Sequence, residues 1–298
     1  MDRDPTIDIS DVADYFVDMT EIQEIDHMDD EMFIMYAEQM NLNNFQGILV
    51  MENVMGIAFS TFYNRYPSCK AIIENTADLD DDQFREKFSD INIATRIILC
   101  LNGEINSAFN RRLRMLKLDL IPNLEEELHF IELVSMKFKK SSIAWHYRKA
   151  VLTHFLSLYI GEKAEILKIL DSENIFLEKF LKKYPRNYYG WSYKKFLYEE
   201  ILLKNKLFDR LYLEFFKQKD ICEKNIHDYS SFHLLEFLIS ELREKIDLKE
   251  ELSWIKDLIL KYEQMYTLER QDPSNLEVKL YEMETAKKYL KFLEMHIK

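Results

Sequence analysis

The 298-residue chain contains few of the residues that break regular structure, with only 5 glycines and 5 prolines. Sandwiches and barrels need many tight turns, so this scarcity argues against an all-β fold. No run of eighteen apolar residues occurs, no segment alternates strictly between apolar and polar residues, and the N-terminus is acidic rather than basic and apolar. We therefore expect no membrane span, signal peptide or transit peptide.

Cysteine and positive charge are also scarce. The three cysteines, Cys69, Cys100 and Cys222, are widely spaced and odd in number, which is typical of small core residues in a reduced, cytoplasmic protein. The net charge of −13 argues against nucleic acid as the main ligand. The chain has no glycine-rich phosphate loop, no Ser-His-Asp or Cys-His signature, and no histidine set at metal-ligand spacing, so we expect no metal site in it.

The negative charge is concentrated at the N-terminus, where residues 1–32 hold twelve Asp or Glu against Arg3 alone. Such a segment is usually solvated and partly disordered. A helical stripe nevertheless runs through it, so it could instead fold against a basic partner surface; the stripe consists of Ile9, Val12, Phe16 and Met19. We assign residues 1–32 to an acidic, partly disordered N-terminal segment and residues 33–298 to a single helical-repeat domain.

Apolar residues recur at intervals of three and four, which predicts an all-α fold. Four segments share one pattern: "NGEINSAFNRRLRML", "KKSSIAWHYRKAVL", "PRNYYGWSYKKFLY" and "IHDYSSFHLLEFLI". Their central aromatic anchors, Phe109, Trp145, Trp191 and Phe232, lie 36, 46 and 41 residues apart, which indicates a repeated two-helix unit. The predicted repeat cores lie near 102–117, 139–154, 185–201 and 226–241. The partner helices between them are expected at about 124–138, 163–184 and 207–224, and a degenerate last hairpin is expected near the C-terminus.

Each column of the repeat has a structural interpretation. The residue before the anchor is small, which a close helix approach requires: Ala108, Ala144, Gly190 and Ser231. Four residues before the anchor stand good helix N-caps: Ser141, Asn187 and Asp228, with Asn106 expected to cap one residue later in the first copy. A base follows the anchor by three residues in three copies, where it can bond to the next hairpin: Arg112, Arg148 and Lys194.

"YPRNYYGWSYKK" resembles the protein prenyltransferase alpha-subunit repeat, whose signature is Asn-Tyr-x-x-Trp-x-x-Arg, and "FKKSSIAWHYRK" keeps its Trp and Arg. The resemblance spans roughly residues 45–240. It implies a right-handed superhelix of antiparallel helical hairpins wrapped around a separate beta subunit. The beta subunit would carry the zinc and the isoprenoid pocket, so this chain would bind no cofactor itself and would not be active alone.

The resemblance further implies the alpha subunit of a heterodimeric protein geranylgeranyltransferase, type III-like. The enzyme would use geranylgeranyl diphosphate as co-substrate and modify a protein substrate at a C-terminal cysteine. The expected partner resembles the beta subunit of Rab geranylgeranyltransferase. An alternative function is a non-catalytic helical-repeat adaptor or scaffold. An ordinary tetratricopeptide protein fits less well, because the spacing varies and that family's Gly, Ala and Pro columns are missing.

Three site residues follow from the resemblance. Lys140, five residues before Trp145, matches a lysine that reaches the isoprenoid diphosphate, where it would act as the catalytic cation. Tyr188, with Tyr189 beside it, matches a substrate-binding tyrosine near the same diphosphate. The alternatives are an ordinary surface lysine and tyrosines that pack between hairpins. The tyrosine is replaced by Ser142 in the second repeat and by Asn106 in the first, which weakens any contact that depends on it there.

Overall fold

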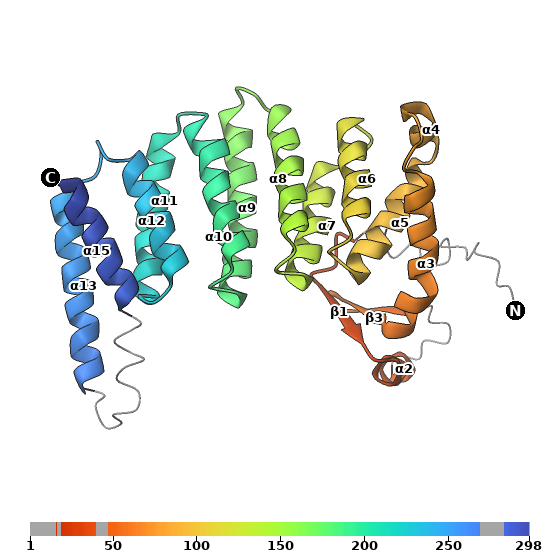
Figure 1. Cartoon of the computed structure of the whole chain (residues 1–298), viewed down its shortest axis with the longest axis horizontal. Helices are drawn as coiled ribbons and strands as arrows, with labels where there is room; N and C mark the ends of the chain where they lie inside the picture. The colour runs from red at the N-terminus through yellow and green to blue at the C-terminus, as the bar shows by residue number, and fades with distance from the viewer. Residues whose placement is uncertain (1–15, 17–18, 40–46, 269–282, 298) are drawn as a thin grey trace, which may run out of the picture. The chain divides into compact units, whose positions relative to one another are not determined.

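The structure is a computed structural model that describes residues 16, 19–39, 47–268 and 283–297. The chain divides into two compact units, Met1–Gly161 and Glu162–Lys298. Both units are built mainly of helices, as the periodicity predicts (Figure 1). No helix in the described ranges is long and apolar enough to cross a membrane.

The first unit begins with a small mixed sheet that the sequence pattern did not reveal. Its strands are β1 (Glu24–Met28), β2 (Ile48–Met51) and β3 (Val54–Ala58), in the order β1-β3-β2. β1 runs parallel to β3, and β2 and β3 form an antiparallel hairpin. Helix α2 (Asp30–Gln39) packs on the sheet through a core of Met28, Phe33, Ala37, Leu49 and Ala58.

Two glycines allow this sheet to form. Gly47 precedes β2 with a φ of +78°, in the left-handed region that favours glycine. A Cβ at Gly56 in β3 would lie 2.6 Å from the Met28 side chain of the neighbouring strand. The strands are only four or five residues long. Most side chains of β2 and β3 are buried or half-buried, so apolar and polar residues do not alternate strictly along them.

Backbone carbonyls and a carboxylate in the described part of the acidic segment accept hydrogen bonds from basic side chains of the same unit. Arg96 Nη1 donates to the Phe16 carbonyl (3.3 Å), and Lys137 Nζ donates to Asp26 (3.0 Å). His129 Nε2 donates to the Ile22 carbonyl (2.8 Å). Ile9 and Val12 of the predicted stripe lie outside the described residues. The division at residue 32 into a tail and one repeat domain stays a prediction, although residue 32 lies inside α2.

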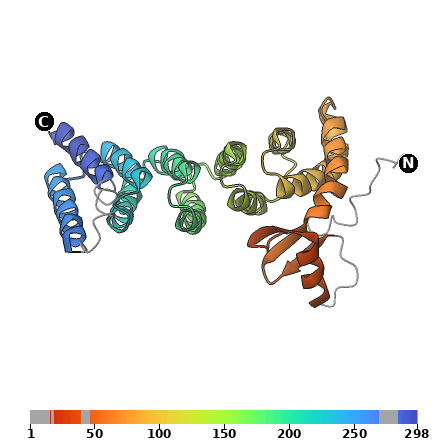
Figure 2. The same ribbon diagram turned by 60° about the horizontal axis from the view of Figure 1, so that its bottom comes forward.

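Helices complete the first unit. α3 (Phe59–Asn75), α4 (Asp81–Glu86) and α5 (Phe88–Leu101) precede the first predicted repeat core, which forms α6 (Asn106–Lys117). α7 (Leu124–Lys137) and α8 (Ser142–Ser157) then pack as a hairpin, seen nearly end-on in Figure 2. The predicted partner helix at 124–138 is therefore confirmed. The segment directly before α3 forms the β2–β3 hairpin.

The second unit consists of consecutive hairpins. α9 (Lys163–Lys183) pairs with α10 (Tyr188–Leu197), which continues as a π-helical turn, η1 (Tyr198–Leu203). α11 (Phe208–Lys224) pairs with α12 (Tyr229–Glu241), and α13 (Leu248–Leu268) pairs with α15 (Glu284–Ile297). The partner helices predicted at 163–184 and 207–224 match α9 and α11 closely, and α13 with α15 forms the degenerate last hairpin.

The predicted helix caps are confirmed in three repeats and wrong in the first. The side chains of Ser141, Asn187 and Asp228 each accept a hydrogen bond from a backbone N–H in the first turn of their helix. In the first repeat the N-cap is Ile105, and Asn106 is already the first helical residue, without a capping role. The polar turn residue lies earlier in this copy: the Asn102 side chain accepts a hydrogen bond from the Glu104 N–H (3.0 Å) and so stabilises the turn before α6.

Candidate functional site

Lys140 lies in the turn that joins α7 to α8, immediately before the N-terminus of α8, and is exposed. The adjacent Ser141 fixes this turn: its hydroxyl donates to the Gly103 carbonyl (2.5 Å) and accepts from the Ala144 N–H (3.2 Å). Within the described part of the chain, no hydrogen bond or ion pair engages the Lys140 ammonium. A free ammonium beside the positive end of a helix dipole forms a site for an anion.

Tyr188 and Tyr189 occupy the first turn of α10, in the second unit. Asn187 holds this turn by accepting a hydrogen bond from the Gly190 N–H (3.0 Å). Tyr188 is 72% exposed and its ring meets that of Tyr189 edge-on, with the centroids 5.5 Å apart. Tyr189 is half-buried. The Tyr188 hydroxyl is therefore available to a ligand, whereas Tyr189 mainly supports the Tyr188 ring.

Tyr188 forms one wall of a pocket of about 390 Å³ between α10 and α12, which we call the α10–α12 pocket. Its lining residues are Tyr188, Trp191, Ser192, Lys195, Tyr229, Ser230, His233 and Leu234. The Lys195 charge is partly offset by Glu199, 3.7 Å away, and His233 Nδ1 lies 3.1 Å from a Glu236 carboxylate oxygen. The pocket thus offers hydroxyl donors and aromatic faces rather than strong positive charge.

The second wall of this pocket was not predicted from the sequence. Tyr229 and His233 belong to the fourth repeat, and their rings stack with centroids 6.1 Å apart and an interplanar angle of 8°. Tyr229 stands three residues before the anchor Phe232, as Tyr188 stands three residues before Trp191. Comparing that column across all four repeats would have found it.

The repeat tryptophans and bases are structural, as expected. Trp145 is 2% and Trp191 6% exposed. Arg148 Nη1 donates to the Leu128 carbonyl (2.8 Å), and Lys194 Nζ donates to Gln218 (3.3 Å) on the next hairpin. Burial lowers the pKa of Lys194 despite the nearby Glu214 carboxylate. These side chains join helices, and of the four only Trp191 also lines the α10–α12 pocket.

A buried ionic network lies at the base of the second repeat. Arg112 Nε donates to Glu127 Oε1 (2.7 Å), its Nη2 donates to Oε2, and the Tyr147 hydroxyl donates to Oε1 (2.6 Å). Burial alone would raise the pKa of Glu127, but the Arg112 charge and its hydrogen bonds lower that pKa overall. Burial, reinforced by the Glu127 charge, raises the pKa of Tyr147 well above 10. All three groups are satisfied and enclosed, so the network stabilises the fold.

The recurrence of the buried glutamate in later repeats was also not predicted from the sequence. Glu127, Glu173 and Glu214 each stand eighteen residues before an anchor and are almost fully buried. Glu173 accepts from the Tyr193 hydroxyl (2.7 Å), as Glu127 does from Tyr147. The fourth repeat has Leu234 where these tyrosines stand, and Glu214 accepts from the Tyr198 hydroxyl instead (3.0 Å). A tyrosine two residues after the anchor paired with a buried glutamate is therefore shared by the second and third repeats, and the fourth repeat keeps only the glutamate.

Across the described residues, no group of three or more His, Cys, Asp or Glu side chains is placed to hold a metal ion. The three cysteines are free thiols in buried positions. Burial raises the pKa of each thiol to about 12, so none of them is a ready nucleophile or metal ligand in the folded chain.

Comparison with known proteins identifies the repeat. The protein prenyltransferase alpha subunit repeat matches residues 124–155 and 170–201. The first range covers the α7–α8 hairpin, and the second covers most of α9 with α10. The Geranylgeranyl transferase type-2 subunit alpha of Saccharomyces cerevisiae is 26% identical over 194 residues. The match covers 63% of this chain and 55% of the relative, so the chain spans about half the length of that protein.

Proposed function

We propose that this chain, which contains protein prenyltransferase alpha-subunit repeats, is the alpha subunit of a heterodimeric protein geranylgeranyltransferase of a type III-like kind. The observation that carries the proposal is that the two matched repeats fall on two consecutive hairpins, α7–α8 and α9–α10. The yeast relative is named as an alpha subunit of a geranylgeranyl transferase, which favours this isoprenoid over others.

The proposal divides the chemistry between two subunits. A beta subunit like that of Rab geranylgeranyltransferase would supply zinc, to activate the substrate cysteine as a thiolate, and the pocket for the lipid. This chain would present the protein substrate and help to bind geranylgeranyl diphosphate. Its buried thiols and its enclosed Glu127 network fit a supporting role, because both are shielded from solvent by the fold. We expect the enzyme to act in the cytoplasm.

Lys140 is the residue of this chain that we expect to act on the reaction itself. When the carbon–oxygen bond to the diphosphate breaks, negative charge accumulates on the leaving diphosphate. An exposed ammonium next to the N-terminus of α8 would stabilise that charge in the transition state more than in the ground state. Tyr188 would donate one hydrogen bond from its exposed hydroxyl to the bound substrate, with Tyr189 supporting its ring.

The first experiment tests assembly. The chain is co-expressed with a Rab geranylgeranyltransferase beta subunit, and the mixture is separated by size-exclusion chromatography. A stable one-to-one complex is expected, and the purified complex should transfer radiolabelled geranylgeranyl to a protein ending in cysteine. The absence of any complex would refute the proposal and leave the alternative, a non-catalytic helical-repeat adaptor, which the loss of tyrosine at Asn106 and Ser142 favours.

The second experiment tests Lys140 within the assembled complex. Lys140→Ala should reduce the single-turnover rate of transfer by roughly tenfold or more, because a transition-state charge contact contributes about 1.4 kcal/mol for each factor of ten. The matched control is Lys139→Ala, which removes an equal charge from the neighbouring exposed position. Equal effects of both variants, or no effect of Lys140→Ala, would contradict the assignment.

A further inference from the structure

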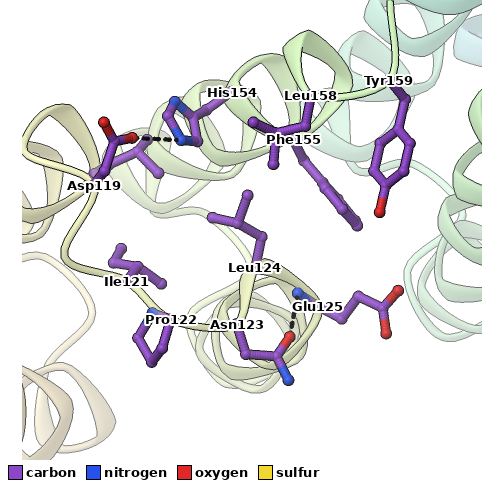
Figure 3. A pocket seen from close by; sticks show the side chains of 11 residues that line it. Asp119, Ile121, Pro122, Asn123, Leu124, Glu125, His154, Phe155, Leu158 and Tyr159 are labelled. Atoms are coloured by element: carbon purple, nitrogen blue, oxygen red, sulfur yellow. Dashed lines mark hydrogen bonds and ion pairs between the residues drawn. The ribbon is translucent and has the colours of Figure 1, made fainter.

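A second cavity lies in the first unit, where the turn from α6 to α7 faces the end of α8 (Figure 3). Its volume is about 470 Å³, in the range of roughly 300–1,000 Å³ that small-ligand pockets occupy. We call it the α6–α8 cavity. None of the residues that carry the proposed prenyltransferase role, Lys140, Tyr188 and Tyr189, lines it.

The wall of the α6–α8 cavity is apolar. Leu116 and Phe155 are buried lining residues. Leu124 points from the start of α7 toward α8 (Figure 3). Ile121 and Leu158 stand nearer the mouth, and Leu158 is 59% exposed to solvent. A concave site lined mainly by apolar side chains suits an apolar group of a ligand.

The rim of the cavity is acidic. Asp119 and Glu125 are exposed, and the lining within the described residues includes no lysine or arginine. Asp119 has a φ of +53°, a left-handed conformation that places its carboxylate 3.2 Å from His154 Nε2 at one end of the cavity. Glu125 extends beside Tyr159 at the other end (Figure 3). Phosphate-bearing and carboxylate-bearing ligands would be repelled at this rim, whereas a cation would be attracted.

We propose that the α6–α8 cavity docks a segment of a partner protein that presents an apolar side chain directly followed by lysine or arginine. The apolar side chain would pack against Phe155, Leu124 and Leu158, which removes hydrocarbon from water. The basic head would remain at the wet rim and pair with Asp119 or Glu125. This docking does not depend on a beta subunit, so it goes beyond the proposed prenyltransferase role and can be tested on the full chain alone.

The test uses two fluorescein-labelled peptides, acetyl-Gly-Ser-Phe-Lys-Ser-Gly and its counterpart with Glu in place of Lys. Binding to the full-length chain is measured by fluorescence anisotropy. The Phe-Lys peptide should bind, and the Phe-Glu peptide should bind about tenfold more weakly or less, since their apolar parts are identical and only the charge differs. Failure of the Phe-Lys peptide to bind, or equal binding of both peptides, would overturn the proposal.

Variants locate the binding site. Leu158→Trp should fill the mouth and abolish peptide binding, whereas Ile160→Trp, two residues along and 83% exposed, does not line the cavity and should leave binding unchanged. Asp119→Asn keeps a residue type that tolerates positive φ and should weaken the Phe-Lys peptide about three- to fivefold. Glu104→Gln is the charge-matched control. Unchanged binding to Leu158→Trp, or equal losses in Asp119→Asn and Glu104→Gln, would refute this location.

Discussion

The buried carboxylate of Glu127 provides the sharpest test of how the repeats are held together. Glu127 is fully buried and accepts hydrogen bonds from Arg112 and from Tyr147. Glu127→Gln would replace the carboxylate with an amide of the same shape. The substitution removes the negative charge and leaves the buried guanidinium of Arg112 without its counter-ion. Removing one partner of a buried ion pair costs about 3–5 kcal/mol, because the remaining charge stays desolvated.

Among the described residues, the surroundings of Arg112 offer no other anion that could pair with its guanidinium in the Glu127→Gln variant. Arg112 is fully buried, and its other hydrogen bonds go to neutral acceptors, the Thr95 hydroxyl (2.8 Å) and Asn92 Oδ1 (3.1 Å). Arg96 Nη2 lies 3.7 Å from the same carboxylate, so a second cation would lose part of its compensation. By contrast, Tyr147→Phe removes one hydrogen bond and should cost only about 1–2 kcal/mol.

The assay is urea unfolding followed by circular dichroism, with hydrogen exchange to locate the loss of stability. Peptides from α6, α7 and α8 should lose protection in Glu127→Gln, while peptides from α13 should not. Glu125→Gln is the control, because it lies in the same first turn of α7 but is exposed and should cost less than about 1 kcal/mol. If both variants unfold at the same urea concentration, the reasoning about a buried ion network is wrong.

Four further results are expected. The pKa of Glu127 is lowered in the folded state, so its contribution to stability is complete above its ordinary pKa of 4.5 and is lost as the pH falls through the lower folded pKa. The free energy of unfolding should therefore decrease as the pH falls in the acid range, and Glu127→Gln should lack this part of the decrease. Gly190→Ala should destabilise the second unit by about 1–2 kcal/mol in urea unfolding, because the new Cβ would lie 2.9 Å from the Phe180 ring; an unchanged midpoint would show that the ring can move. Asn187→Ala should cost about 1 kcal/mol through loss of the α10 cap, and Asn187→Ser should restore most of it. A thiol reagent should label the three cysteines only after denaturation, and rapid labelling of the native chain would contradict their burial.

Much of the helical fold could be predicted from local pattern. The interval of three and four residues located α7, α9 and α11 to within a residue or two at each end. The small residue before each anchor was also interpretable, since at Gly190 a Cβ would meet Phe180 and Leu181. The N-caps were predicted correctly where a Ser, Asn or Asp stands four residues before the anchor. The prediction was wrong in the first repeat, where the side chain of Asn102, not that of Asn106, accepts a backbone hydrogen bond in the loop.

The small sheet was not predictable in the same way. β1 and β3 are parallel neighbours separated by a helix in the sequence, so their pairing depends on contacts between distant residues. Short strands covered on both faces carry no alternating pattern. His129 and Arg96, which no local pattern singles out, bind backbone carbonyls in the described part of the acidic segment.

For the candidate site, the sequence by itself determined the positions within each repeat: Lys140 stands five residues before Trp145, Tyr188 stands three residues before Trp191, and the helical period fixes the face on which each anchor lies. Only the tertiary structure decided which of them reach solvent and what surrounds them. It buried the anchors and the repeat bases, left Lys140 and Tyr188 exposed, and brought Tyr229 opposite Tyr188 across the α10–α12 pocket. The physical reason is that periodicity records contacts within one helix, whereas burial and pocket formation depend on how neighbouring hairpins pack against each other.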